Sequence, residues 1–312
     1  MKDRRRVGRP IVAITAAEYE GDAIRAALEL LPMADLITSS DTVVITPNWV
    51  NPRPPQTGAV VGPESLRELI QLVKGRNPRR LVVATGSGGA PTPQVMKAVG
   101  YDRILEEEKI EFVDLNYGPY TDTEIPMPGT VPGRTHFNRL YNETDVLISF
   151  TQLKVHEEAT VSLGLKNIAM GWPPAEIHGF PKKQTGIHTD LHQWIASMAK
   201  KFPIDLTILS TDKAMIGTGP SGGVAVDSNL IIAGTDPVAT DVIGARLLGF
   251  LPQAVQYLYQ LILEGIGEGD VKKMDLRGIP LEQAEGAFSQ AAYGRSVVVD
   301  NEKIRPLPIG VP

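Results

Sequence analysis

The sequence predicts an α/β protein of two layered domains or lobes, with mainly parallel sheets and a cleft between them. Short runs rich in Val and Ile recur along the chain, as expected of strands that are buried on both faces. Helical patterns alternate with these runs, and such alternation favours a layered α/β architecture. The 312 residues suffice for two domains of ordinary size. We place the boundary near residue 150, between an N-terminal domain (1–150) and a C-terminal domain (151–312), and either domain can be discontinuous.

Eight apolar runs are the predicted strands, and five helical patterns between them are the predicted helices. The strands are expected at residues 11–15, 42–46, 80–85, 111–115, 145–150, 205–210, 230–234 and 296–299. The helices are expected at residues 22–31, 63–74, 187–201, 237–248 and 252–264. The third strand also leads into a helix through Pro91 and Pro93. Asp236 before Pro237 is a typical N-cap for the helix that follows.

Two segments, residues 48–62 and 116–134, are rich in Pro and Gly and show almost no periodicity. Unstructured loops of this length are uncommon in compact domains and often serve as lids or binding loops. The alternative is that both are surface excursions without a function.

The composition narrows the classes of partner. A formal net charge of −5 argues against a duplex nucleic-acid binder but permits a small anionic molecule in a local pocket. The absence of cysteine excludes disulfides, iron–sulfur clusters, thiolate zinc sites and a cysteine nucleophile. No apolar run approaches the roughly 18 residues that span a bilayer, and the basic N-terminus is not followed by an apolar signal segment. We therefore expect a cytoplasmic protein without a membrane partner.

A glycine-rich turn follows the third predicted strand and is the first candidate binding site. It consists of Thr85, Gly86, Ser87, Gly88 and Gly89. Its backbone N–H groups and the following helix N-terminus could hold an anion at the carboxyl end of a strand. The turn matches neither a Walker loop nor G-x-G-x-x-G. The alternative is a strand-to-helix turn that binds nothing.

Lys154, His156 and Lys166 follow a strongly apolar strand and are the candidate catalytic residues. Alternation along an extended strand would place Lys154 and His156 on one side, and the lysine would favour a neutral imidazole, ready to act as base or ligand. Burial and the charge of Lys154 would lower the pKa of Lys166, whereas Glu157 or Glu158 would oppose that shift. The alternative for Lys166 is a solvated surface residue.

Two further groups are weaker candidates. His188 and His192 have the i, i+4 spacing of metal ligands on a helix that starts near Gly186, and His178 could join them around a divalent cation. Asp212 and Lys213 follow another strand and could contact an anionic ligand. Asp241 lies within an apolar helix and needs a partner, either Arg246 or a backbone amide.

Several of these segments together resemble the family called domain of unknown function 362. The resemblance covers roughly residues 40–250 and is carried by Lys154-x-His156 with Leu165-Lys-Asn, then by Gly217-Thr-Gly-Pro and 235–241. The strand end at Asn48 is similar to the family's Lys-Pro-Asn, with Thr46 where lysine is usual. The resemblance implies an α/β fold. Many members add a ferredoxin-like cluster domain, which this cysteine-free chain cannot carry.

A weaker resemblance is to the lactate racemase family. It rests on Ala84-Thr-Gly at a strand end and on His156 followed ten positions later by Lys166. In that family the lysine holds a nickel-pincer nucleotide and the histidine acts as acid and base. This sequence departs from the pattern at Ser87-Gly-Gly, where Thr-His-Arg is usual, and at Asn116, which stands about where another histidine is expected.

The sequence thus favours an enzyme that performs acid/base chemistry on a small carboxylate in an interdomain cleft. His156 would be the base, Lys154 and Lys166 would stabilise charge or attach a cofactor, and the 85–89 turn, with Asn48, Asn116, Asp212 and Lys213, would bind the ligand. A divalent metal or a metal-containing organic cofactor is one option, and a racemase-like or lyase-like reaction is the first hypothesis. The alternative is a small-ligand or metal-binding protein without turnover. The oligomeric state stays open, with a homo-oligomer among the options.

Overall fold

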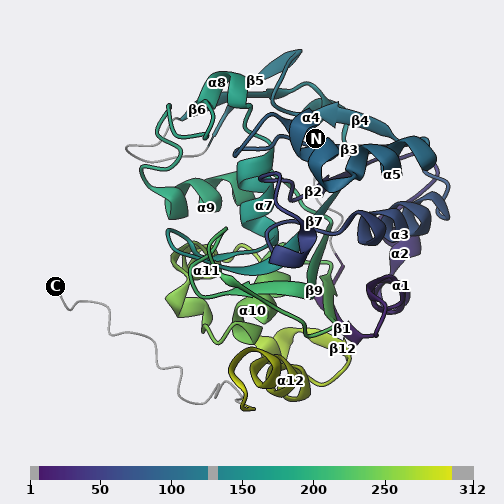
Figure 1. Cartoon of the computed structure of the whole chain (residues 1–312), viewed down its shortest axis with the longest axis vertical. Helices are drawn as coiled ribbons and strands as arrows, with labels where there is room; N and C mark the ends of the chain where they lie inside the picture. Colours follow the sequence, from purple (N-terminus) through teal and green to yellow (C-terminus); the bar gives the residue numbers. More distant parts are fainter. Residues whose placement is uncertain (1–6, 126–132, 297–312) are drawn as a thin grey trace.

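A ten-stranded sheet forms the centre of the computed structural model, which describes residues 7–125 and 133–296. Its main path runs in the order β12-β1-β11-β9-β7-β2-β3-β4 (Figure 1). These strands are β1 (Ile11–Ala16), β2 (Thr42–Pro47), β3 (Arg80–Thr85), β4 (Glu111–Asp114), β7 (Val146–His156), β9 (Leu206–Ile216), β11 (Leu230–Gly234) and β12 (Asp275–Gly278). The short β8 (Thr160–Ser162) and β10 (Val224–Val226) pair with β7 and β9, and β5 (Tyr120–Glu124) pairs with β6 (Arg134–Asn138) in a separate sheet.

Most pairs in the large sheet are parallel. The strands β9, β7, β2, β3 and β4 run in one direction, and β12 is parallel to β1, whereas β11 is antiparallel to both of its neighbours. The predicted α/β class with a mainly parallel sheet is therefore confirmed. Strands from both halves of the chain join this one sheet, and residue 150 lies within β7. The division into two domains stays a prediction.

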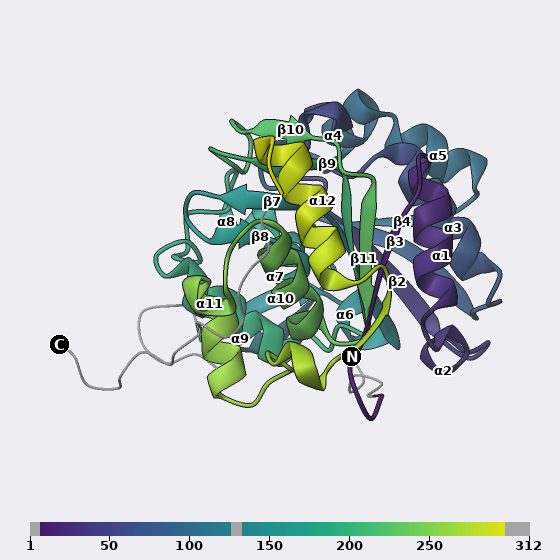
Figure 2. The same ribbon diagram turned by 90° about the horizontal axis from the view of Figure 1, so that it is seen from below.

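Helices cover both faces of the sheet, which explains why its strands are apolar at alternate and intervening positions. On one face lie α1 (Glu20–Glu29), α2 (Met33–Leu36), α3 (Pro63–Lys74), α4 (Thr92–Val99) and α5 (Tyr101–Glu107). On the other lie α7 (Gly164–Gly171), α9 (Leu191–Lys201), α10 (Pro237–Leu247), α11 (Gln256–Leu263) and α12 (Leu281–Tyr293), as Figure 2 shows. Within β1, Ile11 and Ala13 pack into one core and Val12 and Ile14 into the other.

Short elements connect these layers. They are α6 (Leu140–Glu143), α8 (Ala175–His178) and the 3₁₀ turns at Pro55–Thr57, Pro252–Ala254 and Val271–Lys273. Asp236 caps α10, as predicted, and its carboxylate accepts hydrogen bonds from the amides of Val238 and Ala239. Of the strand predicted at 296–299, residues 297–299 lie outside the described residues.

The helix predicted from residue 187 begins later than expected, at Leu191. Asp190 is its N-cap, and the carboxylate accepts a hydrogen bond from the amide of Gln193 at 3.1 Å. The expected shared helix face of His188 and His192 is therefore wrong, because His188 lies in the turn before the helix. Asp190 fixes this start because its carboxylate accepts a hydrogen bond from an amide in the first turn of the helix. Gly186 has no side chain and could not cap a helix in this way.

Candidate functional site

A cavity of about 260 Å³ opens at the carboxyl ends of β2, β3 and β7. Because these strands are parallel neighbours, the segments that follow them meet at one edge of the sheet. The wall includes residues 48–51 after β2, Thr85, Gly86, Gly88 and Gly89 after β3, Lys154 and His156 on β7, and Lys166 and Asn167 on α7. The structure thus gathers the three candidate catalytic residues and most of the glycine turn around one space, as the sequence predicts.

Asn48 shapes the cavity wall through the loop that follows it. Its side-chain amide donates to the carbonyl of Ala59 at 3.1 Å and accepts from the amide of Val61 at 3.0 Å. The Ala59 carbonyl also accepts a hydrogen bond from Lys154 Nζ at 2.9 Å. Asn48 therefore orients the loop segment against which Lys154 rests.

Lys154 is a lysine in the interior, with 1% of its surface exposed. Burial lowers the pKa of its amine to about 7, and the charge of Lys166 adds to the effect. Its hydrogen-bond acceptor is the neutral carbonyl of Ala59, and no carboxylate within the described residues forms an ion pair with it.

Lys166 lies in the first turn of α7 and is 8% exposed. Within the described part of the chain, its amine donates no hydrogen bond to the protein. Burial lowers its pKa to about 8, and the negative charge of Glu158 opposes this shift. An amine that is buried and has no acceptor of its own is costly, and a bound anion would remove that cost.

The start of α7 is fixed by Asp241 of α10. Its carboxylate accepts the amides of Gly164 at 2.9 Å and Leu165 at 3.0 Å, so its partner is the backbone amide and not Arg246, which pairs with Glu285. Burial raises the pKa of Asp241 to about 7. Gly164 itself is packed closely, since a Cβ there would lie 2.3 Å from Thr207 Cγ2. These contacts fix the helix that carries Lys166.

His156 is neutral and its Nδ1 is already engaged. This nitrogen accepts from the amides of Glu158 at 3.1 Å and Ala159 at 3.3 Å, so the proton of the neutral ring resides on Nε2. Burial lowers the pKa of His156 to about 2, and the charges of Lys166 and Lys154 contribute. The neutral imidazole follows the prediction. The role of base does not fit this geometry, because the ring offers a donor, Nε2–H, and no free lone pair.

The glycine turn uses most of its backbone donors within the protein. The amide of Gly86 donates to the carbonyl of Gly171 at 3.1 Å, and that of Gly89 to Val50 at 2.8 Å. The amide of Ser87 donates to Thr92 Oγ1 at 3.1 Å, and Ser87 itself is absent from the cavity wall. The predicted anion cradle is therefore wrong for these three amides, because acceptors at the end of α7, at the start of α4 and in the loop after β2 consume them.

Lys182 is a site residue that sequence reasoning missed. It is 2% exposed, lines the cavity, and donates from Nζ to the carbonyls of Gly86 at 2.8 Å and Met170 at 2.9 Å. Burial lowers its pKa to about 7, opposed by the charge of Asp114. The run Pro181-Lys182-Lys183 is typical of a solvated loop, so the sequence carries no local signal of this burial.

The rim of the cavity contains an ion-pair group centred on Glu158. Its carboxylate lies 3.1 Å from Lys183 Nζ and 3.0 Å from His188 Nδ1. His188 thus lines the cavity, although not as a member of the predicted histidine cluster.

The remaining predicted site residues lie elsewhere. Asn116 is a structural bridge, since its side chain bonds the carbonyl of Ser87, the hydroxyl of Thr92 and the amide of Ala175. Asp212 and Lys213 do not line the cavity, because β9 continues to Ile216 and Lys213 pairs with Asp227 at 2.8 Å.

The three histidines predicted to bind a metal have separate partners. His178 contacts the hydroxyls of Thr135 and Thr185, His188 contacts Glu158, and His192 accepts the amide of Tyr257. Within residues 7–125 and 133–296, no three His, Cys, Asp or Glu side chains gather closely enough to hold a metal ion. The three-histidine metal site stays a prediction that these contacts do not support.

Comparison with known families gives a match over the part of the chain that lines the cavity. The family described as Domain of unknown function (DUF362) matches residues 43–246, which is more than half of the chain and includes every lysine of the cavity. The chain belongs to this DUF362 family. The description of the family names no reaction, so the function has to be argued from the cavity.

Two individual proteins are similar to this DUF362 chain. A thylakoid-associated protein of Synechocystis sp. (strain ATCC 27184 / PCC 6803 / Kazusa) is 24% identical over 315 residues, with 96% of this chain and 90% of the relative covered. The lactate racemase apoprotein of Thermoanaerobacterium thermosaccharolyticum is similar in structure, with a TM-score of 0.43 and 23% identity over 75% of this chain. The match spans about 55% of the racemase chain. No helix in the described part of the DUF362 chain is both long and apolar enough to cross a membrane.

Proposed function

We propose that the cavity is the active site of an enzyme that binds a small carboxylate and moves a proton at a neighbouring atom. The observation that carries this proposal is Lys166, a buried amine that donates to no described residue and faces the same space as Lys154 and His156. A carboxylate would supply the acceptor that Lys166 lacks and the negative charge that both lysines lack.

Lys166 is best suited to transfer the proton. Its pKa of about 8 lies close to neutrality, which is where a general base or acid is most effective. The charge of Lys166 adds to burial in lowering the pKa of Lys154 to about 7. Between about pH 7 and pH 8, Lys154 is therefore mostly neutral, whereas Lys166 stays charged, holds the carboxylate and can donate its proton. Above about pH 8, Lys166 is mostly neutral and can accept a proton.

His156 would then act as a donor. Its Nε2–H can hydrogen-bond to a carboxylate oxygen or to a developing negative charge, while the amides of Glu158 and Ala159 fix the ring. A neutral imidazole whose pKa is about 2 keeps this proton throughout the physiological range.

The donors around the cavity do not form a metal site of the usual kind. His156 Nδ1 is consumed by backbone amides, Glu158 is paired at the rim, and lysine amines are uncommon ligands. The residues present therefore do not fit a divalent metal held by the protein, and we derive no step through a metal or a metal-containing cofactor.

The second candidate is a protein that binds the same anion without turnover. The loss of His156 as a base favours it, because the proposed enzyme then depends on lysines for all proton transfer. Cytoplasmic location and homo-oligomerisation belong to this set of proposals as well, and cell fractionation and light scattering test them.

Proton exchange in D₂O distinguishes the two candidates. The protein is incubated with lactate, alanine, malate or aspartate. Proton NMR then follows the loss of the signal of the hydrogen on the carbon beside the carboxylate. We expect exchange of at least one compound, and a loss of about 100-fold or more in Lys166→Met. Lys74→Met, a lysine far from the cavity on α3, is the matched control and should retain the rate.

The outcomes separate the hypotheses. Binding in a titration without exchange would favour the non-catalytic protein. Exchange that is unchanged in Lys166→Met would remove this lysine from the mechanism. No binding of any of the four compounds would overturn both candidates.

A further inference from the structure

The cations of the cavity form two groups that are held by different parts of the fold. Lys154 and Lys166 lie close enough for the charge of one to act on the other, and both act on His156. Lys182 is fixed elsewhere, by the carbonyls of Gly86 after β3 and Met170 in the last turn of α7. The charge that acts on Lys182 is that of Asp114.

Helix α7 gives a measure of the separation between the two groups. Lys166 is in its first turn, whereas the Met170 carbonyl that accepts from Lys182 is four residues later. Four residues correspond to a rise of about 6 Å along a helix axis. The backbone positions that hold the two groups are therefore separated along α7, and the groups also respond to different charges, so we expect a single carboxylate to contact one of them and not both.

Neither group is neutralised by a carboxylate of its own. Glu158, the acidic residue that acts on Lys166, is bound by Lys183 and His188 at the rim. Asp114 accepts from Thr92 and from the amide of Asn116, and it forms no ion pair with Lys182. The charges of Glu158 and Asp114 thus act on Lys166 and Lys182 from a distance, and neither forms a direct ion pair with these lysines within the described structure.

Resting on the proposed anion site, we infer that the natural ligand is a small dianion with an acidic group at each end of the cavity. One group lies against Lys154, Lys166 and the Nε2–H of His156, and the other against Lys182 and the amide of Gly88. The second group is a carboxylate or a phosphate. This inference narrows the substrate from any carboxylate to compounds that carry two separated negative groups.

Matched ligands of equal chain length test the inference. Calorimetry on the full chain compares malonate with propionate, succinate with butyrate, and glutarate with pentanoate. Because each pair differs in one carboxylate, the affinity ratio within a pair measures the second group. We expect at least one dicarboxylate to bind about 10-fold or more tightly than its monocarboxylate. 3-Phosphonopropionate, which has a phosphonate in place of one carboxylate of succinate, distinguishes the two chemistries.

A variant locates the second group. Lys182→Met has a similar volume and removes a buried charge, and a thermal melt checks that it folds. It should reduce the dicarboxylate preference to about twofold or less and leave the monocarboxylate affinity nearly unchanged. Lys74→Met, a change of a lysine on α3 away from the cavity, is the control and should keep the preference.

Equal affinities within all three pairs, measured on the unchanged chain, would overturn the inference, as would a preference that persists in folded Lys182→Met. If monocarboxylates bind and exchange protons just as well, the proposed enzyme stands and the dianion is wrong. If dicarboxylates bind tightly but nothing exchanges, the dianion stands and the enzyme is wrong.

Discussion

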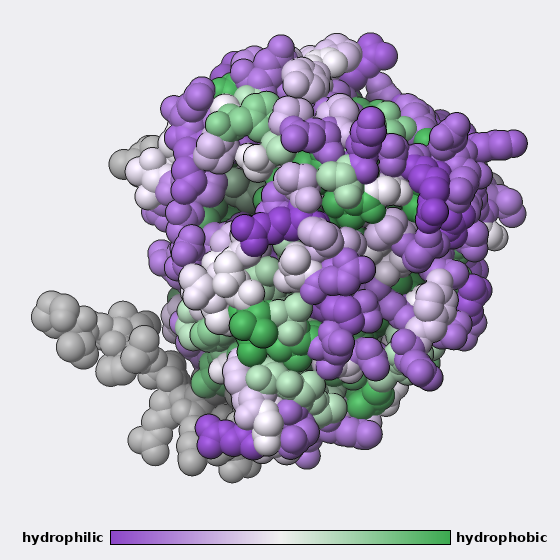
Figure 3. Space-filling view, in the orientation of Figure 1, coloured by the Kyte–Doolittle hydropathy of each residue, from purple (hydrophilic) through white to green (hydrophobic). Residues whose placement is uncertain are grey.

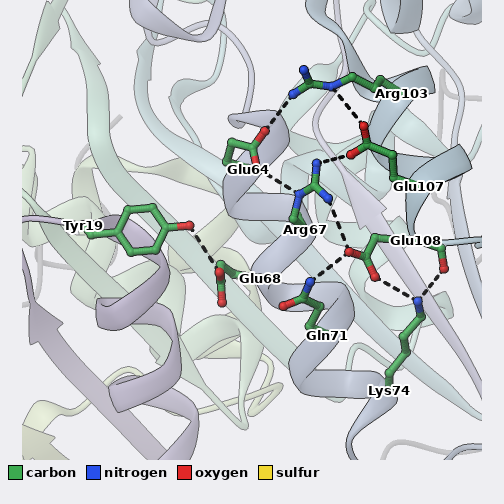
Figure 4. A network of polar contacts seen from close by, with 9 residues as sticks. All are labelled: Tyr19, Glu64, Arg67, Glu68, Gln71, Lys74, Arg103, Glu107 and Glu108. Carbon is green, nitrogen blue, oxygen red and sulfur yellow. Dashed lines mark hydrogen bonds and ion pairs between the residues drawn. The ribbon is translucent and has the colours of Figure 1, made fainter.

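Basic residues have different partners in two regions of the molecule: carboxylates on helices α3 and α5, and backbone carbonyls or no described acceptor in the cavity. On α3 and α5, Arg67 contacts Glu64, Glu107 and Glu108, and Lys74 pairs with Glu108 at 2.9 Å (Figure 4). The surface over these helices is predominantly hydrophilic in Figure 3. In the cavity, Lys154 and Lys182 donate to backbone carbonyls, and Lys166 donates to no described residue.

The difference indicates which region is prepared for a ligand. Exposed cations are stabilised by water and by nearby carboxylates, and such pairs contribute little to folding. Buried cations without a carboxylate destabilise the fold unless something else supplies negative charge. Three such lysines lie around one space, and the nearby Glu158 is paired at the rim, so this arrangement supports the proposal that a bound molecule supplies the negative charge.

A carboxylate added to the cavity would give its lysines a negative partner like those on α3 and α5. Of the changes considered, we expect this one to have the largest effect on ligand affinity. Thr151 lines the cavity on β7, so Thr151→Asp would place a negative charge beside the lysines. We expect the affinity for succinate to fall by about 100-fold, because the new carboxylate competes for the same donors and repels the ligand. Calorimetry on the variant measures the change.

Thr151→Asn is the control for this experiment, since it has the same size without the charge. It should retain most of the affinity, and a thermal melt should show both variants folded. Equal losses in the two variants would mean that shape, and not charge, governs binding.

Removing the amine of Lys154 should have the second-largest effect, a change in the free energy of unfolding that depends on pH. The pKa of Lys154 is about 7 in the folded protein against an ordinary 10.5, so between these values the unfolded chain binds more protons. The free energy of unfolding therefore rises with pH across this window, and the penalty of the buried charge is greatest below about pH 7. Lys154→Met should stabilise the protein at pH 6, by an amount on the order of a few kcal/mol.

The same variant should lose this advantage at high pH. Near pH 10 the amine of the unchanged protein is neutral when folded, and the variant lacks the hydrogen bond to Ala59. Thermal melts of both proteins from pH 6 to pH 10 should therefore cross. A constant difference at all pH values would show that Lys154 is not destabilised by burial of its charge.

A smaller effect is expected from the rim. Glu158 raises the pKa of Lys166, so Glu158→Gln should lower that pKa further and shift the base-dependent limb of the exchange rate toward acidic pH. The rate of deuterium exchange, measured against pH for both proteins, shows the shift. Glu29→Gln, an exposed position on α1 away from the cavity, is a control that should leave the profile in place, and a shift toward alkaline pH in Glu158→Gln would contradict the proposed electrostatics.

The sequence predicted the layers of the fold better than the details of the site. Both β3 and β11 begin and end where expected, because strands buried on two faces need apolar residues at every position. The long β7 and β9 extend past their predicted ends, since their backbone groups there pair with the short strands β8 and β10. Such pairing by short strands has no strong pattern of its own.

For the site, Lys154, His156 and Lys166 were predictable because they follow a recognisable strand. The protonation of His156 was predictable only in part. Its neutrality follows from burial together with the neighbouring lysines, which the sequence shows, but its tautomer depends on two amides in the next turn. Lys182 was not predictable: its burial depends on carbonyls 96 and 12 residues away in the chain. Contacts of this kind arise only when the loops are packed together.

The smallest effect on stability should come from a change on α3, where the exposed lysine pair serves as the reference for the buried lysines. Lys74 contacts both the carboxylate and the backbone carbonyl of Glu108, and its side chain is 38% exposed. Because exposed pairs contribute less than about 1 kcal/mol, Lys74→Met should lower the melting temperature slightly at low salt. In 1 M salt, where the screening length is about 3 Å, the difference should nearly vanish. Thermal melts and urea denaturation of both proteins, at low and high salt, measure this change in stability.

The stability change of Lys154→Met should be much less sensitive to salt, because ions do not enter the buried site. A salt dependence of equal size in both variants would mean that the cavity is as open to solvent as the surface of α3. Its lysines would then be screened by water and ions and would not require a bound anion.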